Sequence, residues 1–284
     1  MKNDQVPYHV HITAEQSPMS MNLKEVWRYR DLIILFTKRT FKLMYKQTIL
    51  GPLWIVISPL LTSIIYTIIF GDIAQLSTNG VPKFLFYLCS HSLWVFFADC
   101  LNKNSSTFLT NAQMFSKVYF PRLTIPISSV LTSGIQFLIH SAMVVVLILW
   151  SMFQGKVHPR WELLPLVPVL LILTAMMGLG LGVLISSVTT KYRDLSFLVG
   201  FGLSLWMYSS PVIYPLSQAD GGLFYKMLLW NPMTAPMELF RLIMLGEGNV
   251  AIQSVISTVV FTAFAFIAGV VTFNKVERSF IDTV

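Results

Sequence analysis

The chain has 284 residues, of which 55% are hydrophobic and only 12% are charged, and it carries a formal net charge of +7. Because a soluble domain carries about 25% charged residues, this composition excludes an ordinary water-soluble globular protein. The two cysteines, Cys89 and Cys100, fall within one expected helix and about 16 Å apart along it. That separation excludes a disulfide inside the helix.

The N-terminal region divides into a polar segment and a basic amphipathic one. Residues 1–20 are polar and lack the apolar run of a secretory signal, so they are predicted to be a flexible cytoplasmic N-terminus. Residues 21–48 combine apolar side chains with seven cations. This mixture is typical of a helix that lies in the headgroup layer and contacts membrane lipids. A soluble docking helix is the alternative interpretation.

Long apolar runs predict six transmembrane helices within residues 49–274. Each run can cross a hydrocarbon core about 30 Å thick, which takes roughly 20 helical residues. None alternates polar and apolar residues as barrel strands do, so the prediction is an all-α membrane protein. The fourth run contains small residues at 176–182 that permit close helix packing. The six runs are residues 47–71, 84–101, 123–154, 163–190, 195–219 and 250–274.

The distribution of cations predicts that both termini are cytoplasmic. With six spans, fifteen of the 20 Lys and Arg residues fall on the side of the termini, which includes the tail at residues 275–284. Cytoplasmic loops carry such an excess of cations. The basic charge therefore indicates orientation in a membrane, and nucleic acid is not an expected partner.

The segment between the second and third spans, residues 102–122, is predicted to be a short helix followed by a sharp turn. Residues 105–116 are the best helical candidate, because either of the first two serines can cap the free N–H groups. In the sequence KVYFPR that follows, Pro121 keeps Phe120 out of helical geometry, so the chain turns there. The cations and rings expected in the interface layer are Lys117, Tyr119, Phe120 and Arg122.

The segment between the fifth and sixth spans, residues 218–249, is hydrophobic but interrupted by Asn231–Pro232 and Pro236. Two short helices, at 223–230 and 235–245, are predicted to dip into the outer leaflet as a re-entrant hairpin. Irregular backbone at that depth must lie against protein or a wet cavity.

Two further features belong to this outer region. The sequence SSPVIYP, with Pro211 and Pro215, can break the fifth helix near its outer end. Glu238 and Arg241 are three residues apart, so they are predicted to pair and steady the hairpin.

The sequence lacks the motifs that would power or catalyse a reaction. It contains no phosphate-binding loop of the form GxxxxGK[ST], no zinc-ligand spacing and no serine-nucleophile motif, so an enzyme is not expected. The charge-free runs also lack the acid–base chain of a proton-coupled pump. Two exceptions, His91 and His140, are either functional or hydrogen-bonded packing residues. Energy for transport is therefore expected from another chain.

Four sequence blocks occur in order along the chain after residue 25: MYKQTILGPLW (44–54), KVYFPRL (117–123), YRDLSFL…LWMYSSPVIYP (192–215) and NPMTAPMELFR (231–241). Together they resemble the membrane subunit of ABC exporters of the polysaccharide and polyol-phosphate class, which exports O-antigen, capsular and teichoic acid polymers. The resemblance implies that two copies enclose one channel. It also implies two ATPase subunits that bind ATP and Mg²⁺, with no cofactor on this chain.

The resemblance implies a coupling role for the segment between spans two and three. This helix would dock on the ATPase subunit, and the stiff turn after it would pass movement to the third span. An interface anchor without energy transfer is the alternative interpretation. The coupling residues are Ser105, Ser106, Phe115, Lys117, Tyr119, Phe120, Pro121 and Arg122.

The resemblance also implies sites for the cargo, a lipid-linked polysaccharide. Arg39, Lys42 and Lys46 recur at helical spacing and could bind the lipid phosphate, or equally the anionic bulk lipid. Aromatic rings would stack on sugar faces along the path, at Trp94, Phe96, Phe97, Trp206, Tyr208 and Tyr214. The outer gate would comprise Pro211, Pro215, Asn231, Pro232, Glu238 and Arg241.

The sequence departs from the family pattern at a few positions. Gly200 and Ser204 stand where relatives often have Pro and Gln, and the stretch Ser90–Ser92 is more polar than usual. The identity of the polymer therefore stays open. Two rival functions also stay open: a permease of the same machine type that exports a small lipid or drug, and a membrane enzyme that modifies lipid-linked glycans.

Overall fold

The computed structural model of the protein describes residues 23–46, 48–115, 117–118, 120–189, 194–219 and 221–281. All regular secondary structure within these ranges is helical, which confirms the predicted all-α fold. The predicted N-terminal segment, residues 1–20, lies outside the described residues.

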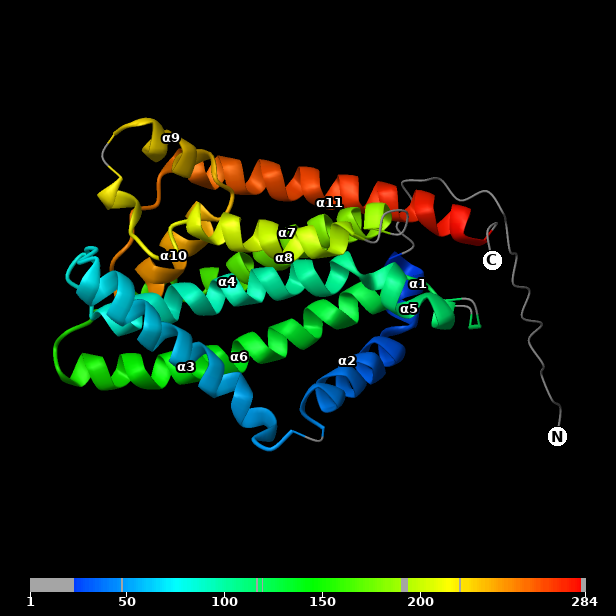
Figure 1. The fold of residues 1–284 in the computed structure, drawn as a ribbon, viewed down its shortest axis with the longest axis horizontal. Helices are drawn as coiled ribbons and strands as arrows, with labels where there is room; N and C mark the ends of the chain where they lie inside the picture. The colour runs from blue at the N-terminus through cyan, green and yellow to red at the C-terminus, as the bar shows by residue number, and fades with distance from the viewer. Residues whose placement is uncertain are drawn as a thin grey trace, which may run out of the picture.

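Five helices are long and apolar enough to cross a membrane. Four of them, from the second onward along the chain, run roughly along the longest axis of the molecule, whereas the first is inclined to it (Figure 1). The first is continuous over Gly51–Ile73 and comprises η1 (Gly51–Leu53), α3 (Trp54–Tyr66) and η2 (Thr67–Ile73). The other four are α4 (Lys83–Ser105), α6 (Thr124–Phe153), α7 (Leu166–Thr189) and α11 (Ile252–Ile281).

The fifth predicted span, over residues 195–219, is not confirmed. Its helix, α8 (Leu195–Tyr208), has 14 residues. It is therefore about 21 Å long, less than the roughly 30 Å of a hydrocarbon core. After Tyr208 the chain turns through residues 209–214 instead of continuing as a helix.

The ends of the long helices carry short elements. α9 (Leu223–Trp230) and α10 (Thr234–Leu245) lie at one end, and α1 (Leu23–Arg28) and α5 (Thr107–Phe115) lie at the other (Figure 1). The short 3₁₀ turns η3 (Trp161–Leu163) and η4 (Leu216–Gln218) lie in the connections before α7 and before α9. The two short helices predicted between the last two spans are thus present, although their depth in a membrane stays a prediction.

The basic amphipathic segment forms two helices, not the single helix predicted over 21–48. α1 and α2 (Arg30–Tyr45) are separated at Tyr29, whose backbone leaves helical geometry. α2 packs on α6, and its buried Thr37 contacts the Ser128 carbonyl at 3.4 Å. Because only one stripe of α2 faces α6, apolar residues such as Leu35 and Leu43 are exposed together with the cations.

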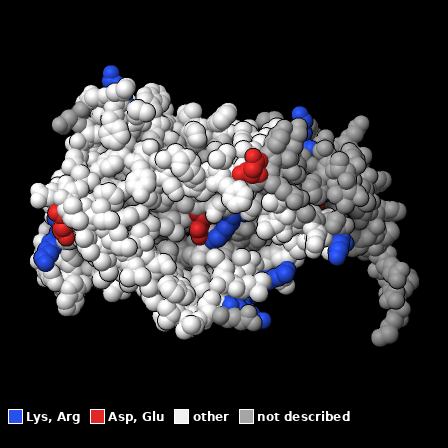
Figure 2. Space-filling model, viewed as in Figure 1, with Lys and Arg blue, Asp and Glu red and all other residues white. Residues whose placement is uncertain are grey.

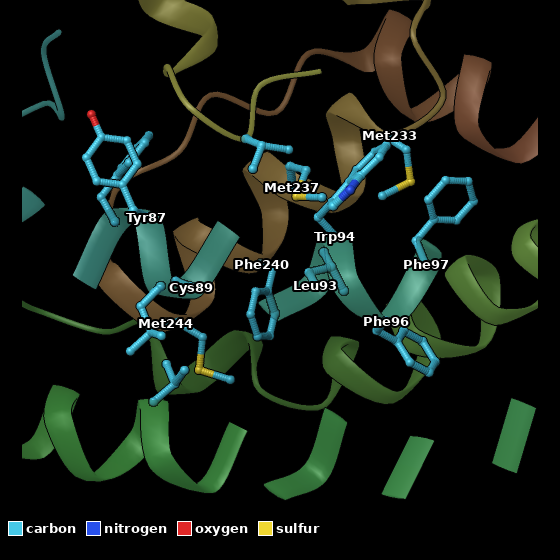
Figure 3. Packing of buried hydrophobic residues seen from close by; sticks show 14 of the residues in the cluster. Tyr87, Cys89, Leu93, Trp94, Phe96, Phe97, Met233, Met237, Phe240 and Met244 are labelled. Carbon is cyan, nitrogen blue, oxygen red and sulfur yellow. The ribbon is translucent and has the colours of Figure 1, made fainter. Parts of the chain in front are cut away.

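The core is built around α4. This helix is apolar on nearly all sides, which is typical of a helix buried within a bundle, and it packs against α3, α6, α7 and α10. Tyr87, Leu93 and Phe97 are fully buried. Met237 and Phe240 of α10 lie against α4 in Figure 3. Both cysteines are also buried here as free thiols, which agrees with the predicted absence of a disulfide between them.

The small residues of α7 let three helices approach closely. A Cβ atom added at Gly178 would lie 2.7 Å from the Cβ of Cys100 in α4. One added at Gly182 would lie 2.6 Å from the Leu101 carbonyl oxygen. On the opposite face of α7, a Cβ at Gly180 would lie 2.7 Å from the backbone of Ala265 in α11. The predicted close packing at residues 176–182 is therefore confirmed.

Replacing Gly180 by alanine is expected to destabilise the protein by about 1–3 kcal/mol, the usual range for overpacking a well-packed core. The new methyl group would meet backbone atoms of α11, which have no freedom to rotate away. Thermal unfolding in detergent measures the effect. Gly200→Ala in α8 is the matched control, because a Cβ there meets nothing within 4 Å. An equal loss in the two variants would contradict close packing at Gly180.

Candidate functional site

α5 is fixed to the bundle by aromatic packing. Phe108 is fully buried, and its ring stacks on Phe273 of α11 with centroids 4.6 Å apart. The backbone N–H of Phe108 donates to the Ser186 hydroxyl of α7 at 3.2 Å. The opposite side of α5 is open, with Leu109 and Thr110 exposed. α5 is therefore a short helix that packs on the bundle with one face and exposes Leu109 and Thr110 on the other.

The predicted serine caps of this helix are wrong. Ser105 is the last residue of α4, and its hydroxyl donates to the Asn102 carbonyl. Ser106 is the C-cap of α4 and has no helix-capping side-chain bond at α5 among the described contacts. A serine of α7, Ser186, accepts from the first turn instead. The helix thus starts two residues later than predicted, because α4 extends through the expected cap.

The turn between α5 and α6 is confirmed, but two of its predicted interface anchors are buried. Phe120 lies between Phe36 and Phe115, at 5.8 Å from each ring centroid. Arg122 is 8% exposed and stands over the Phe115 ring at 5.4 Å. These side chains therefore bind the turn to the protein and not to lipid phosphates.

The remaining coupling residues have mixed positions. Lys117 is exposed, as an interface cation must be, and Pro121 is partly buried. Tyr119 lies outside the described residues. The turn is consequently stiffer than a surface loop, since Phe120 packs in one cluster with rings from α2, α5 and α11.

Glu238 and Arg241 form an ion pair at the opposite end of the molecule, with each side chain only 1% exposed. Arg241 also donates to the Ser90 hydroxyl of α4 and to the Pro211 carbonyl, and it stands 4.6 Å from the Phe86 ring centroid. The pairing predicted from their spacing is confirmed, and it reaches well beyond the hairpin.

The carboxylate of Glu238 joins two further chain segments. One oxygen accepts from the Leu216 N–H at 2.8 Å, and the other accepts from the Asn249 N–H at 2.8 Å. Both carboxylate oxygens and the guanidinium are hydrogen-bonded to other chain segments. The pair therefore links α10 to the segment that follows α8 and to the segment that precedes α11. A buried ion pair is stable only when its remaining hydrogen-bonding groups are satisfied in this way.

Asn231 is a second junction in the same region. Its amide nitrogen donates to the Ser209 carbonyl at 2.7 Å and to the Ser210 hydroxyl at 3.0 Å. Its amide oxygen accepts from the Trp206 indole N–H at 3.1 Å. The outer residues selected from the sequence are therefore brought together around the turn that ends α8.

The predicted sugar-stacking aromatics divide into two groups. Trp94, Phe96 and Phe97 are at most 5% exposed and pack inside the bundle (Figure 3). Trp206 packs on Phe97 with ring centroids 5.1 Å apart.

Two tyrosines of this set lie nearer the surface. Tyr208 is 54% exposed. The Tyr214 hydroxyl donates to the Tyr208 carbonyl at 3.1 Å. The structure thus leaves Tyr208 as the one exposed ring among the six predicted path residues.

The predicted phosphate-binding cations are all exposed, but they do not share one helix face. Arg39 and Lys42 lie on α2, whereas Lys46 follows its end with an extended backbone. Lys46 is therefore free to point in a different direction. Charged side chains are sparse on the face drawn in Figure 2, and most of the basic ones lie in the half that carries α1, α2 and α5.

Sequence reasoning missed a polar cluster inside the bundle. Lys103 of α4 pairs with Asp99 at 2.7 Å and donates to Ser133 and Gln136 of α6 at 3.0 and 2.7 Å. Gln136 in turn donates to the Tyr45 hydroxyl at 2.7 Å. Burial raises the pKa of the Tyr45 phenol, so this group stays protonated.

The two histidines lie beside this cluster. His140 is buried and lines the same cavity as Ile55 and Pro59. His91 packs edge-on against Tyr66, and its Nδ1 atom is buried with no partner among the described residues. The signal available in the sequence was the Asp99–Lys103 spacing of four, which places an acid and a base on one helix face.

These features define a helical protein with at least five membrane-spanning helices, a short helix presented at one end and a buried ionic junction at the other. The chain belongs to the ABC-2 type transporter family, whose sequence pattern matches residues 31–245.

Three curated relatives are similar over most of their length, and each is named an O-antigen export system permease protein RfbA. Two are from Klebsiella pneumoniae. They are 28% and 29% identical over 268 residues, which cover 93% of this chain and 99% of each relative. One from Myxococcus xanthus is 29% identical over 223 residues, or 78% of this chain and 83% of the relative.

Proposed function

We propose that this chain is the permease subunit of an ATP-driven exporter that moves a lipid-linked polysaccharide of the O-antigen type across the bacterial inner membrane. The single observation that supports this most strongly is the similarity to O-antigen export permeases over 93% of the chain. A match of that extent includes the membrane helices, the end that carries α5 and the end that carries the Glu238–Arg241 pair. None of the three relatives is named as a drug exporter or a glycan-modifying enzyme, so neither rival is favoured.

The proposed machine contains two copies of this chain and two ATPase subunits that bind ATP and Mg²⁺. The exposed apolar faces of α3, η2 and α8, which include Ile65, Ile68 and Phe201, suit contact with a second copy or with lipid. The free outer face of α5 suits an ATPase subunit. Movement of α5 would reach α6 through the turn at residues 117–123, because Phe115, Phe120 and Arg122 pack together there.

The cargo would meet the chain at both ends. Arg39, Lys42 and Lys46 are exposed at the basic end and would attract its lipid phosphate. At the other end, the Glu238–Arg241 pair and Asn231 would hold the outer gate around the end of α8. Tyr208 is exposed beside that gate and would offer its ring to a passing sugar.

Deleting the gene for this chain tests the proposal in the cell. The expected result is that lipid-linked polymer accumulates inside the inner membrane and disappears from the surface, because synthesis continues without a path outward. Surface polymer is measured with a specific antibody, and internal polymer is measured after cell lysis. Re-expression of the intact chain is the control and should restore display. Normal surface polymer in the deletion strain would overturn the proposal.

A further inference from the structure

A polar cavity of about 320 Å³ lies between the end of α2 and the helices α3, α4 and α6. Its size is at the lower end of the range for small-molecule sites, which starts at about 300 Å³. Its lining includes Tyr45, Ser58, His91, Asp99 and Gln136. Ionisable groups inside a membrane bundle are costly and are found where they have a function. The transport scheme above does not use this cavity.

The positive charge in the cavity is fully engaged. Lys103 has three N–H donors, and they go to Asp99, Ser133 and Gln136 at 2.7, 3.0 and 2.7 Å. No donor of this ammonium group is left for an incoming anion. A phosphate at this position would also face the Asp99 carboxylate, so the interior of the cavity disfavours anions.

The negative charge is only half engaged. The Oδ2 atom of Asp99 accepts from Lys103, whereas Oδ1 accepts no hydrogen bond among the described contacts. The Asp99 side chain is 33% exposed. An ionised carboxylate can accept about four hydrogen bonds, so the cavity offers an accessible acceptor to a positively charged donor. The Tyr45 hydroxyl, which accepts from Gln136, lies in the same wall.

Apolar side chains flank the cavity at its exposed side. Met44 and Trp54 line the cavity and are 37% and 44% exposed. Apolar side chains at an opening on a membrane helix bundle suit acyl chains, so the cavity is accessible from the lipid.

Two cations neighbour the cavity lining along the chain. Lys42 and Lys46 are exposed and flank Met44 and Tyr45, which line the cavity. The site therefore has an acidic acceptor inside and cations outside. This order of charges matches a headgroup with an ammonium at its tip and a phosphate nearer the acyl chains.

We propose that this cavity binds the headgroup of a zwitterionic aminophospholipid, with its primary ammonium at Asp99 and its phosphate toward Lys42 and Lys46. The ammonium donates to the free Oδ1 atom of Asp99, and the acyl chains leave the cavity past Met44 and Trp54. The bound lipid would fill the space between α2 and the bundle and hold the basic helix against α6.

The test compares lipids that differ in one chemical feature. The full chain, with its ATPase partner where the two purify together, is reconstituted in nanodiscs of equal parts phosphatidylethanolamine, phosphatidylcholine and phosphatidylglycerol. Lipid retained after mild detergent extraction is then counted by native mass spectrometry. Phosphatidylcholine keeps the zwitterion but has no N–H to donate, so it isolates the hydrogen bond to Asp99.

The expected result is about tenfold more phosphatidylethanolamine retained than phosphatidylcholine, which is the ratio for one charge-assisted hydrogen bond. Asp99→Asn should abolish that preference. It should also raise the retention of phosphatidylglycerol, because Lys103 loses its counter-ion. Asp72→Asn is the matched control, since it removes the exposed partner of Lys83 at 2.9 Å in another part of the molecule.

Three outcomes would overturn the proposal. Equal retention of the three lipids would mean that the cavity does not select the ammonium. A preference that survives in Asp99→Asn would place the lipid elsewhere. No retained lipid in the intact protein would mean that the cavity holds water only. The comparison of lipids on the unaltered chain stays decisive even if Asp99→Asn fails to fold.

Discussion

Replacing Glu238 by glutamine is expected to destabilise the protein by about 3–5 kcal/mol, the usual cost of leaving one partner of a buried ion pair without its counter-charge. Arg241 would keep its charge while 1% exposed and would lose its only acidic partner among the described contacts. The loss of stability is measured by thermal unfolding in detergent. Arg241→Met should have a similar effect, because Glu238 would then be the unpaired charge.

The double variant with both substitutions provides the sharper check. Removing both charges leaves no isolated ion, so it should cost less than the sum of the two single changes. Asp72→Asn is the exposed control: it breaks the Lys83 pair, whose side chains are 42% and 60% exposed. Such surface pairs contribute about 0–1 kcal/mol. Equal effects of Glu238→Gln and Asp72→Asn would contradict the role of the buried junction.

Replacing Phe108 by alanine is expected to cost about 3–5 kcal/mol, as for other buried phenylalanines. The side chain is fully buried, and its ring stacks on Phe273, so the change opens a cavity beneath α5. Loss of this support should also weaken transport, because α5 could no longer pass movement to the bundle. Thermal unfolding and export of the polymer are the two measurements.

Leu109→Ala, at the neighbouring position, separates packing from docking. Leu109 is 38% exposed on the free face of α5, so its truncation should change stability by no more than about 0.5 kcal/mol. Binding of the ATPase subunit should nevertheless weaken if this face is the docking surface. Unchanged ATPase binding in Leu109→Ala, together with full stability of Phe108→Ala, would contradict both parts of the coupling proposal.

The elements that the sequence predicted best are those with strong local signals. α9 has the expected bounds, and α10 begins one residue before its expected start. The two helices were predictable because Asn231, Pro232 and Pro236 interrupt a hydrophobic stretch. The Glu238–Arg241 pair was visible from spacing alone. Its partners Ser90, Leu216 and Asn249 were not, because they come from three other segments of the chain.

The sequence could not orient side chains on helices that are apolar all round. The polar residues of α4 did not distinguish the buried Trp94 and Phe97 from residues facing a passage. Lys46 was predicted to lie on one helix with Arg39 and Lys42 because no proline or glycine marks the end of α2. The predicted fifth span is not confirmed over its full length, because composition does not reveal that the helix stops at Tyr208.

The groups around the polar cavity were also only partly predictable from the sequence. Asp99 and Lys103 are four residues apart on one helix, so their pairing was predictable. Gln136 lies 33 residues after Lys103 in the sequence. Tyr45 lies 91 residues before Gln136. Only the packing of α2, α4 and α6 brings these groups together. Intramembrane chemistry was therefore underestimated from charge-free runs taken one at a time.

The most direct test of the account is a transport assay in vesicles that contain this chain with or without its ATPase subunit. A labelled lipid-linked polysaccharide is placed on one side, ATP and Mg²⁺ are added, and labelled polymer on the other side is measured over time. The account predicts repeated transport only when both proteins are present and ATP is hydrolysed. Sustained uphill transport by this chain alone would contradict it.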